Sequence, residues 1–236
     1  MLALTGCESS QEKNAQLARA AKAVEAKALA KGAAAARASQ ITHPSTKVTV
    51  AGVTLLRSSE GLATVVTLHN RTATALREVP VKVTVRDARG RQLYTNATPG
   101  QAAPLVSAAL VPAHATLDWI DDQIPPESAA ASASAEAGEA SSAPGAAPLI
   151  AVQGAHVIED PTNGPGAEGL VANRSALTQH ELVVYAVAER AGKVVAAGRA
   201  VLPEASANST TRFQLFFIGN PQGGKLLVTA PPSTLR

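Results

Sequence analysis

Hydrophobic and polar residues alternate along several short stretches of the chain, and a period of two is typical of β-strands. Within Val79–Val85 valine occupies every second position, and Phe213, Leu215 and Phe217 alternate in the same way. Glycine, proline, asparagine and aspartate separate such stretches at intervals of roughly 8–12 residues. The pattern favours short antiparallel strands that bury one face and expose the other.

The strand pattern occurs twice, and the two copies keep their order and spacing. The matching pairs are Val48–Gly52 with Ile150–Gly154, His69–Thr72 with Ala172–Ser175, and Val81–Val85 with Val183–Val187. A duplicated set of short strands indicates two copies of one antiparallel fold. We therefore predict an all-β protein with tandem antiparallel β-sandwiches at residues 47–124 and 149–232.

Two other segments lack this alternation. Residues 125–148 are almost entirely alanine, serine, glycine, glutamate and proline, a composition that predicts an unstructured linker. Residues 8–40 contain good helix formers and no proline, so we expect an N-terminal α-helical spacer before the sandwiches. Its few large apolar residues favour a solvated helix over self-association through the alternative seam of Leu17 and Val24.

The only cysteine, Cys7, follows an apolar residue and two small ones in Leu4-Thr5-Gly6-Cys7. This run resembles the lipobox of bacterial lipoproteins. The resemblance implies that Cys7 carries a diacylglycerol and that residues 1–7 are a remnant of the signal peptide. It also implies a protein anchored by membrane lipid to the extracytoplasmic face of the cell membrane, since a diacyl group attaches durably.

Only six residues precede Cys7, whereas a signal peptide needs a basic region and an apolar region of about 7–15 residues. Two alternatives follow: either translation begins further upstream, or the cysteine is incidental. We expect the first.

A second resemblance rests on the order of features within each unit. An asparagine follows a strand (Asn70, Asn173), then come an alternating valine strand, an acidic turn with Gly90, and later a phenylalanine strand. This order resembles the FxLyD-type immunoglobulin-like domains of bacterial envelope proteins, although the Phe-x-Leu-Tyr-Asp signature itself is absent. It implies two immunoglobulin-like β-sandwiches, a fold often carried by lipoproteins, with no established chemistry.

The net charge of +3 comes from the predicted spacer. Residues 8–37 carry six basic and three acidic side chains, and the rest of the chain carries 15 of each. A basic segment beside a lipid anchor would lie against anionic headgroups. The balanced remainder, together with the scarcity of aromatic residues, argues against a nucleic-acid partner.

Several motifs carry chemistry only in particular contexts. Residues 164–169 match the dinucleotide-binding pattern G-x-G-x-x-G, but no helix follows them, so we expect a loop between strands. Asp118, Asp121 and Asp122 surround Trp119, where carboxylates would bind Ca²⁺ or a sugar. We favour a buried Trp119 with solvated acids around it.

Other candidates favour structural roles. The arginines of a predicted hairpin tip would meet phosphate or an acidic partner, but a solvated tip is the simpler interpretation (Arg86, Arg89, Arg91). Asn70 and Asn173 are expected to bond to backbone at strand ends rather than to a ligand. The five histidines show no metal-ligand spacing (His43, His69, His114, His156, His180).

These observations favour a non-enzymatic, membrane-anchored lipoprotein that requires no cofactor or metal. Its two modules would bind or scaffold a protein or polymer of the cell envelope, through sheet edges and loops. The alternative is a lipoprotein that binds a small molecule or ion between the two sandwiches. The predicted linker argues against a fixed cleft, and a hydrolase is disfavoured because the sequence indicates no nucleophile or metal set.

Overall fold

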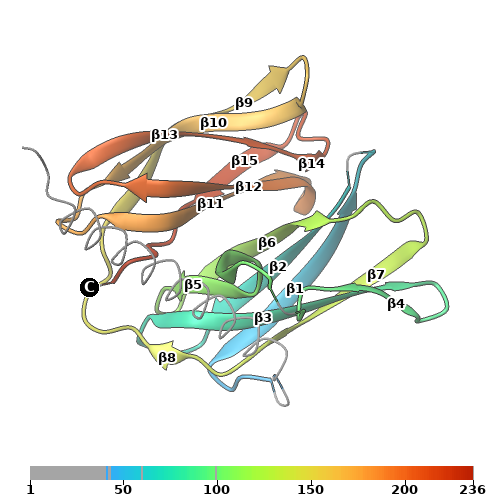
Figure 1. The fold of residues 1–236 in the computed structure, drawn as a ribbon, viewed down its shortest axis with the longest axis horizontal. Coiled ribbons are helices and arrows are strands. Elements are labelled where there is room, and N and C mark those ends of the chain that lie inside the picture. Colours follow the sequence, from blue (N-terminus) through green and yellow to red (C-terminus); the bar gives the residue numbers. More distant parts are fainter. Residues whose placement is uncertain (1–40, 42–43, 60, 99, 236) are drawn as a thin grey trace, which may run out of the picture.

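We describe a computed structural model of the chain, in which residues 41, 44–59, 61–98 and 100–235 are placed (Figure 1). These residues form fifteen strands and one short 3₁₀ helix. In chain order they are β1 (Val48–Arg57), β2 (Leu62–Asn70), β3 (Leu76–Asp87), β4 (Gln92–Thr95), η1 (Ala103–Leu105), β5 (Ser107–Val111), β6 (Thr116–Ile124), β7 (Ala130–Ala137), β8 (Ser141–Ser142), β9 (Ile150–Asp160), β10 (Gly164–Asn173), β11 (Gln179–Arg190), β12 (Lys193–Ala205), β13 (Ser209–Phe216), β14 (Ile218–Gly219) and β15 (Lys225–Thr229).

The strands form four sheets, and every pairing is antiparallel. One sheet has the order β1-β2-β6, and a second is built around β3, which pairs with β4, β5, β7 and β8. The third has the order β14-β12-β11-β15 and the fourth β13-β10-β9. Valine-rich β3 and β11 lie inside their sheets, where β-branched side chains pack well on a pleated surface. The prediction of an all-β protein is confirmed.

The two halves of the chain, β1–β8 and β9–β15, pair their strands in the same register. Val48 lies opposite Asn70 in the first half, and Ile150 lies opposite Asn173 in the second. The paired positions pass over Glu78 in β3 and Glu181 in β11 while the register continues on either side, and both residues have positive φ angles, 49° and 51°. The duplicated sequence pattern therefore corresponds to a duplicated arrangement of strands.

The halves differ at one edge, where β12 continues as a single strand and its counterpart is divided into β4 and β5. Between β4 and β5 the chain leaves the sheet and returns through η1. Buried Asn96 fixes this detour, because its amide nitrogen donates to the carbonyls of Val81 and Leu105, at 2.8 and 2.7 Å. Its Oδ1 accepts the backbone N–H of Val83 at 2.7 Å.

Figure 1 shows the four sheets stacked face to face, with β3 at one side of the stack and with β9 and β10 at the other. The strand β11 is buried on both faces. Leu182, Val184 and Ala186 point into the core of the second half. Val183 and Tyr185 join the core of the first half, beside residues of β2 and β6. The core of the first half thus extends into the second half, and this shared apolar packing opposes independent movement of the two halves.

The prediction of an unstructured linker at 125–148 is wrong for much of its length. The segment contains β7 and β8, and both pair with β3. The strand β7 lies beside β3 as a hydrogen-bonded neighbour, and its Ala130 and Ala137 are buried against the core. Composition predicted disorder because these side chains bury little apolar surface, but β7 also satisfies backbone groups of β3 that would otherwise lack partners.

The predicted helical spacer at 8–40 and the segment 1–7 lie outside the described residues. No helix in the described ranges is long and apolar enough to span a bilayer.

Candidate functional site

Successive side chains of β6 point to opposite faces of its sheet, so this strand supplies residues to both sides of the candidate site. Trp119 is fully buried and its indole N–H donates to the carbonyl of Ser107 at 3.2 Å. The prediction that Trp119 is a core residue is confirmed. The expectation that solvated acids surround it is wrong for two of the three, because Asp121 is fully buried and the side chain of Asp122 is only 15% exposed. Asp118 accepts a 2.7 Å hydrogen bond from the Thr67 hydroxyl.

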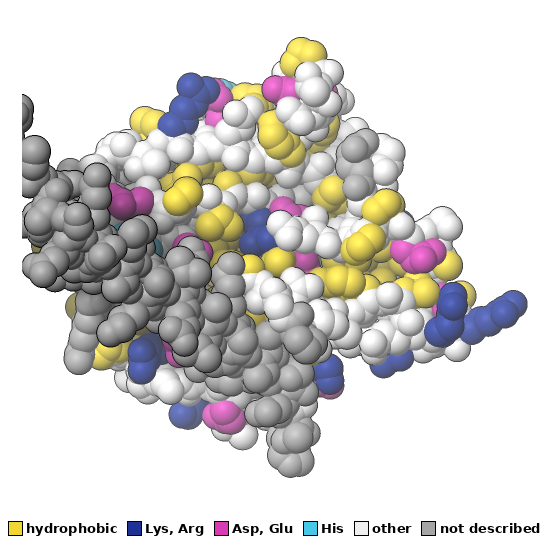
Figure 2. Space-filling view, in the orientation of Figure 1, with side chains coloured by type: hydrophobic (Ala, Val, Ile, Leu, Met, Phe, Trp, Pro, Cys, Tyr) yellow, Lys and Arg dark blue, Asp and Glu magenta, His cyan; other side chains and the backbone are white. Residues whose placement is uncertain are grey.

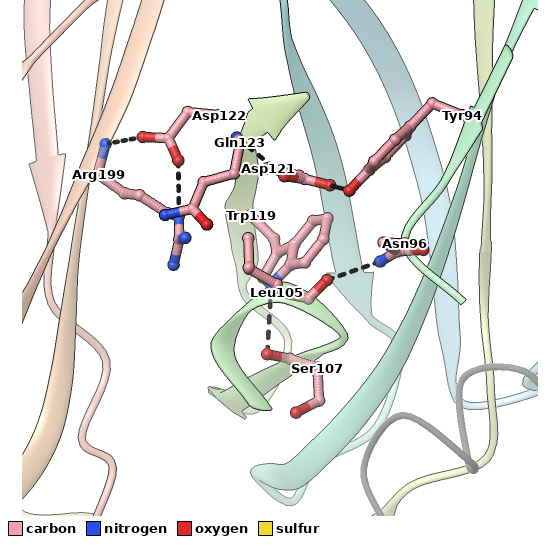
Figure 3. Close-up of polar contacts among 9 residues, drawn as sticks. All are labelled: Tyr94, Asn96, Leu105, Ser107, Trp119, Asp121, Asp122, Gln123 and Arg199. Carbon is pink, nitrogen blue, oxygen red and sulfur yellow. Dashed lines mark hydrogen bonds and ion pairs between the residues drawn. The ribbon is translucent and has the colours of Figure 1, made fainter. Parts of the chain in front are cut away.

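Asp121 faces the interior of the first half (Figure 3). Its carboxylate accepts a 2.7 Å hydrogen bond from the Tyr94 hydroxyl and a 3.1 Å bond from the backbone N–H of Gln123. Burial raises the pKa of Asp121, and the hydrogen bonds from Tyr94 and Gln123, with the charge of Arg199, only partly oppose it. Burial, aided by the nearby Asp121 charge, also raises the pKa of Tyr94.

Asp122 points the other way and binds Arg199 of β12. Arg199 donates its backbone N–H to Oδ2 at 3.0 Å and its Nε–H to Oδ1 at 2.8 Å. The Arg199 side chain is 5% exposed, so this ion pair is shielded from solvent. Tyr185 lies opposite Arg199 in the β11–β12 ladder, and burial raises the pKa of its hydroxyl. The pair therefore links the two halves beside their shared core.

A cleft of about 680 Å³ opens at this junction. Both halves contribute to it, and its lining consists of Ser58, Ser59, Asp122, Pro161, Thr162, Asn163, Gly164, Pro165, Arg199, Phe216, Phe217, Ile218 and Gly219. In Figure 1 the β1–β2 turn and the β9–β10 turn lie at the same end of the molecule. Figure 2 shows basic and acidic side chains reaching the surface together between the two halves. The cleft combines apolar rings with an ion pair, hydroxyls and an amide, a mixture common in small-molecule sites.

Asn70 and Asn173 have the structural role that the sequence predicts. The amide nitrogen of Asn70 donates to the carbonyls of Thr74, Val111 and Pro112, at 2.8–3.1 Å. The amide nitrogen of Asn173 donates to three carbonyls at the equivalent corner, those of Leu177, Ala205 and Ser206. Each Oδ1 accepts the backbone N–H and the hydroxyl of the residue two positions on.

The arginines of the β3–β4 hairpin make local contacts. Arg91 pairs with Asp87 at 3.1 Å, and Arg86 donates to the carbonyl of Gly90 at 3.0 Å. Asp87 also accepts the backbone N–H groups of Arg89 and Arg91. These bonds close the turn, as expected for a solvated hairpin tip.

The G-x-G-x-x-G run is not a loop, because residues 164–169 form the first part of β10. Two of its glycines lie where β10 is closely approached by the neighbouring strands of its own sheet. A Cβ on Gly166 would lie 2.4 Å from the carbonyl oxygen of Leu215, and one on Gly169 would lie 2.9 Å from the Phe213 ring. The glycines at these two positions therefore reflect close contact between paired strands.

The remaining candidates do not converge on a site. The described residues contain no group of three or more His, Cys, Asp or Glu side chains able to hold a metal ion. His156 Nε2 lies 3.4 Å from a carboxylate oxygen of Glu168, and Glu168 also binds Arg212. Cys7 and His43 lie outside the described residues, so lipid attachment at Cys7 stays a prediction.

Sequence reasoning missed Arg199, which lines the cleft and binds Asp122. A signal was present, because Arg199 is the only charged residue between Val194 and Leu202. A lone charge in an apolar strand requires a buried partner. The partner, Asp122, belongs to the other half of the chain and no local pattern reveals it.

Comparison with known proteins assigns the chain to no group: no family model matches it, and no curated protein matches it.

Proposed function

We propose that the protein is a lipoprotein, anchored through an acylated Cys7 on the extracytoplasmic face of the cell membrane. Its two β-sandwich modules, of immunoglobulin-like type, would present one rigid surface to a protein or polymer of the cell envelope. The observation that carries the proposal is the apolar core shared by the two halves, in which Val183 and Tyr185 pack with residues of β2 and β6. A rigid pair of modules avoids the entropy loss that flexible modules suffer on binding.

Two experiments test this proposal. The intact mass of protein extracted from membranes should exceed the mass of the unmodified chain by a diacylglyceryl group, and Cys7→Ser should abolish the difference and release the protein from the membrane fraction. Cross-linking in intact cells, followed by purification, should recover an envelope protein or polymer above the level recovered with a membrane-anchored control of unrelated fold. An unmodified thiol at Cys7, or recovery no higher than the control, would contradict the corresponding half of the proposal.

A second candidate function is the binding of a small molecule between the two sandwiches. The cleft of about 680 Å³ at their junction favours it, since sites for small ligands are commonly found between domains. The expected linker argued against such a site, but β7 and β8 belong to the first half, and the shared core holds the walls of the cleft in place. A panel of small molecules should contain compounds that raise the melting temperature of the full chain.

A further inference from the structure

Arg199 is a buried cation whose hydrogen-bonding capacity is only partly used. A guanidinium has five N–H donors. Its Nε–H binds Asp122, but among the described residues neither terminal nitrogen of Arg199 has a hydrogen-bond acceptor. With the side chain 5% exposed, these donors have limited access to bulk water, and Arg199 is one of the residues that line the cleft between the two halves. Donors of a buried cation that the described residues leave unpaired favour binding of an external acceptor.

The orientation of the guanidinium is fixed by its own strand and by the opposite half. The backbone N–H and the Nε–H of Arg199 hold the two oxygens of Asp122, at 3.0 and 2.8 Å. This grip leaves the edge formed by the two terminal nitrogens directed away from Asp122 (Figure 3). That edge is a planar fork, and it matches the two oxygens of a carboxylate or phosphate.

The rest of the lining defines the body of the ligand. Phe216, Ile218 and Pro165 supply apolar surface, and Thr162 and Asn163 supply polar groups at the rim. The Thr162 and Asn163 backbone N–H groups both donate to Asp160, so the β9–β10 turn is held in shape without a ligand. The cleft thus offers an apolar wall beside a preformed oxyanion fork.

We infer that the cleft between the two halves binds a small molecule with an oxyanion attached to a compact apolar body, and that Arg199 receives the oxyanion. This inference rests on the second candidate function and specifies its ligand class. It does not depend on the lipid anchor. Asp122 is a positioning residue. It binds the backbone N–H and the Nε–H of Arg199 and so orients the guanidinium, and the two terminal nitrogens remain for the ligand.

Nuclear magnetic resonance titration of the full chain tests the inference, with amide signals of Phe217 and Gly219 as reporters. The probes are benzoate, its neutral analogue benzamide, and phenyl phosphate, all at constant ionic strength. Benzoate should shift these signals with a dissociation constant of about 10 mM or below. Benzamide should bind roughly ten- to a hundredfold more weakly, because it lacks the charge that strengthens a hydrogen bond. If phenyl phosphate binds more tightly than benzoate, the role of Arg199 as the oxyanion-binding residue stands, and the preferred ligand is a phosphate rather than a carboxylate.

Two variants locate the effect. Arg199→Lys keeps the charge beside Asp122 but removes the fork, and it should weaken benzoate binding by roughly tenfold or more. Arg212→Gln is the matched control, since Arg212 is 70% exposed and pairs with Glu168, away from the cleft, and its benzoate affinity should equal that of the native chain. If Arg199→Lys does not fold, the benzoate–benzamide ratio in the native chain decides.

Two outcomes would overturn the inference in different ways. Equal binding of benzoate and benzamide, unaffected by Arg199→Lys, would leave a small-molecule site but remove the oxyanion from it. Absence of signal shifts at Phe217 and Gly219 with every probe up to about 20 mM would remove both the oxyanion and the small-molecule site.

Discussion

Asp122 on β6 accepts both the backbone N–H and the Nε–H of Arg199 on β12, and the two strands belong to different halves of the chain. The side-chain ion pair and the backbone hydrogen bond therefore act together to hold β6 and β12 at the junction of the two halves. A buried pair of this kind adds little net stability compared with apolar residues, but its loss leaves an unpaired buried charge. It favours one relative placement of the two halves over others.

Asp122→Ala should destabilise the protein by roughly 3–5 kcal/mol, because it leaves the Arg199 guanidinium buried without its carboxylate. Replacing both partners, as in Asp122→Leu with Arg199→Met, should recover most of that loss. Urea unfolding of the two single variants and the double variant measures the coupling. A loss below about 1 kcal/mol in Asp122→Ala would show that solvent screens the pair as it screens a surface ion pair.

The buried carboxyl of Asp121 predicts a pH dependence of stability. Its pKa is raised in the folded state by burial, so the folded protein binds this proton more tightly than the unfolded chain does. The native chain should therefore lose stability from this group as pH rises from about 4 through the raised pKa. Asp121→Asn lacks the titration, so its stability relative to the native chain should increase over that interval and then stay level.

Glu168→Gln is the control of opposite sign for the pH experiment. The hydrogen bond from Arg212 lowers the pKa of Glu168, so its contribution to stability is lost as pH falls through the lowered pKa. Urea midpoints of both variants and the native chain between pH 3 and 8, roughly the range that brackets these groups, separate the two effects. Parallel stability profiles for Asp121→Asn and the native chain would contradict the raised pKa.

The equivalent asparagines predict equivalent losses. Asn70→Ala and Asn173→Ala each remove the amide that serves three backbone carbonyls, and each should cost about 1–3 kcal/mol. Asn163→Ala is the control, because its amide binds Asp160 on an exposed turn and its loss should be small. Denaturant midpoints compare the three. A large loss at Asn70 with none at Asn173 would show that the two corners do not share a role.

Some of this fold could be predicted from sequence, because local patterns determine it. The alternating valines of β3, the recurrence of Asn70 and Asn173, and the core position of Trp119 all follow from period, spacing and burial preference. The repeat could be recognised in the sequence because the two halves place similar residues at equivalent positions of their paired strands.

The junction could not be predicted, because it depends on contacts between distant residues. The alternation of β11 indicates a buried strand, but only the tertiary fold shows that Val183 and Tyr185 join the other half's core. Likewise, the charge of Arg199 predicts that a partner exists and not that the partner is Asp122. The alanine-rich strand β7 was missed because its stability comes from pairing with β3 rather than from its own side chains.

Ser134 in β7 allows that last point to be tested. The N–H of Gly138 donates to the carbonyl of Pro80 at 2.9 Å, and the alternation of an antiparallel ladder gives the N–H of Ser134 the same role toward Thr84. Ser134→Pro removes that donor and should cost about 1–3 kcal/mol in urea unfolding, whereas proline in a true linker would be tolerated. Ser134→Ala is the matched control, because it alters an exposed side chain and keeps the N–H, so its stability should stay near that of the native chain. Equal stability of the proline and alanine variants would mean that β7 does not hold β3 in solution.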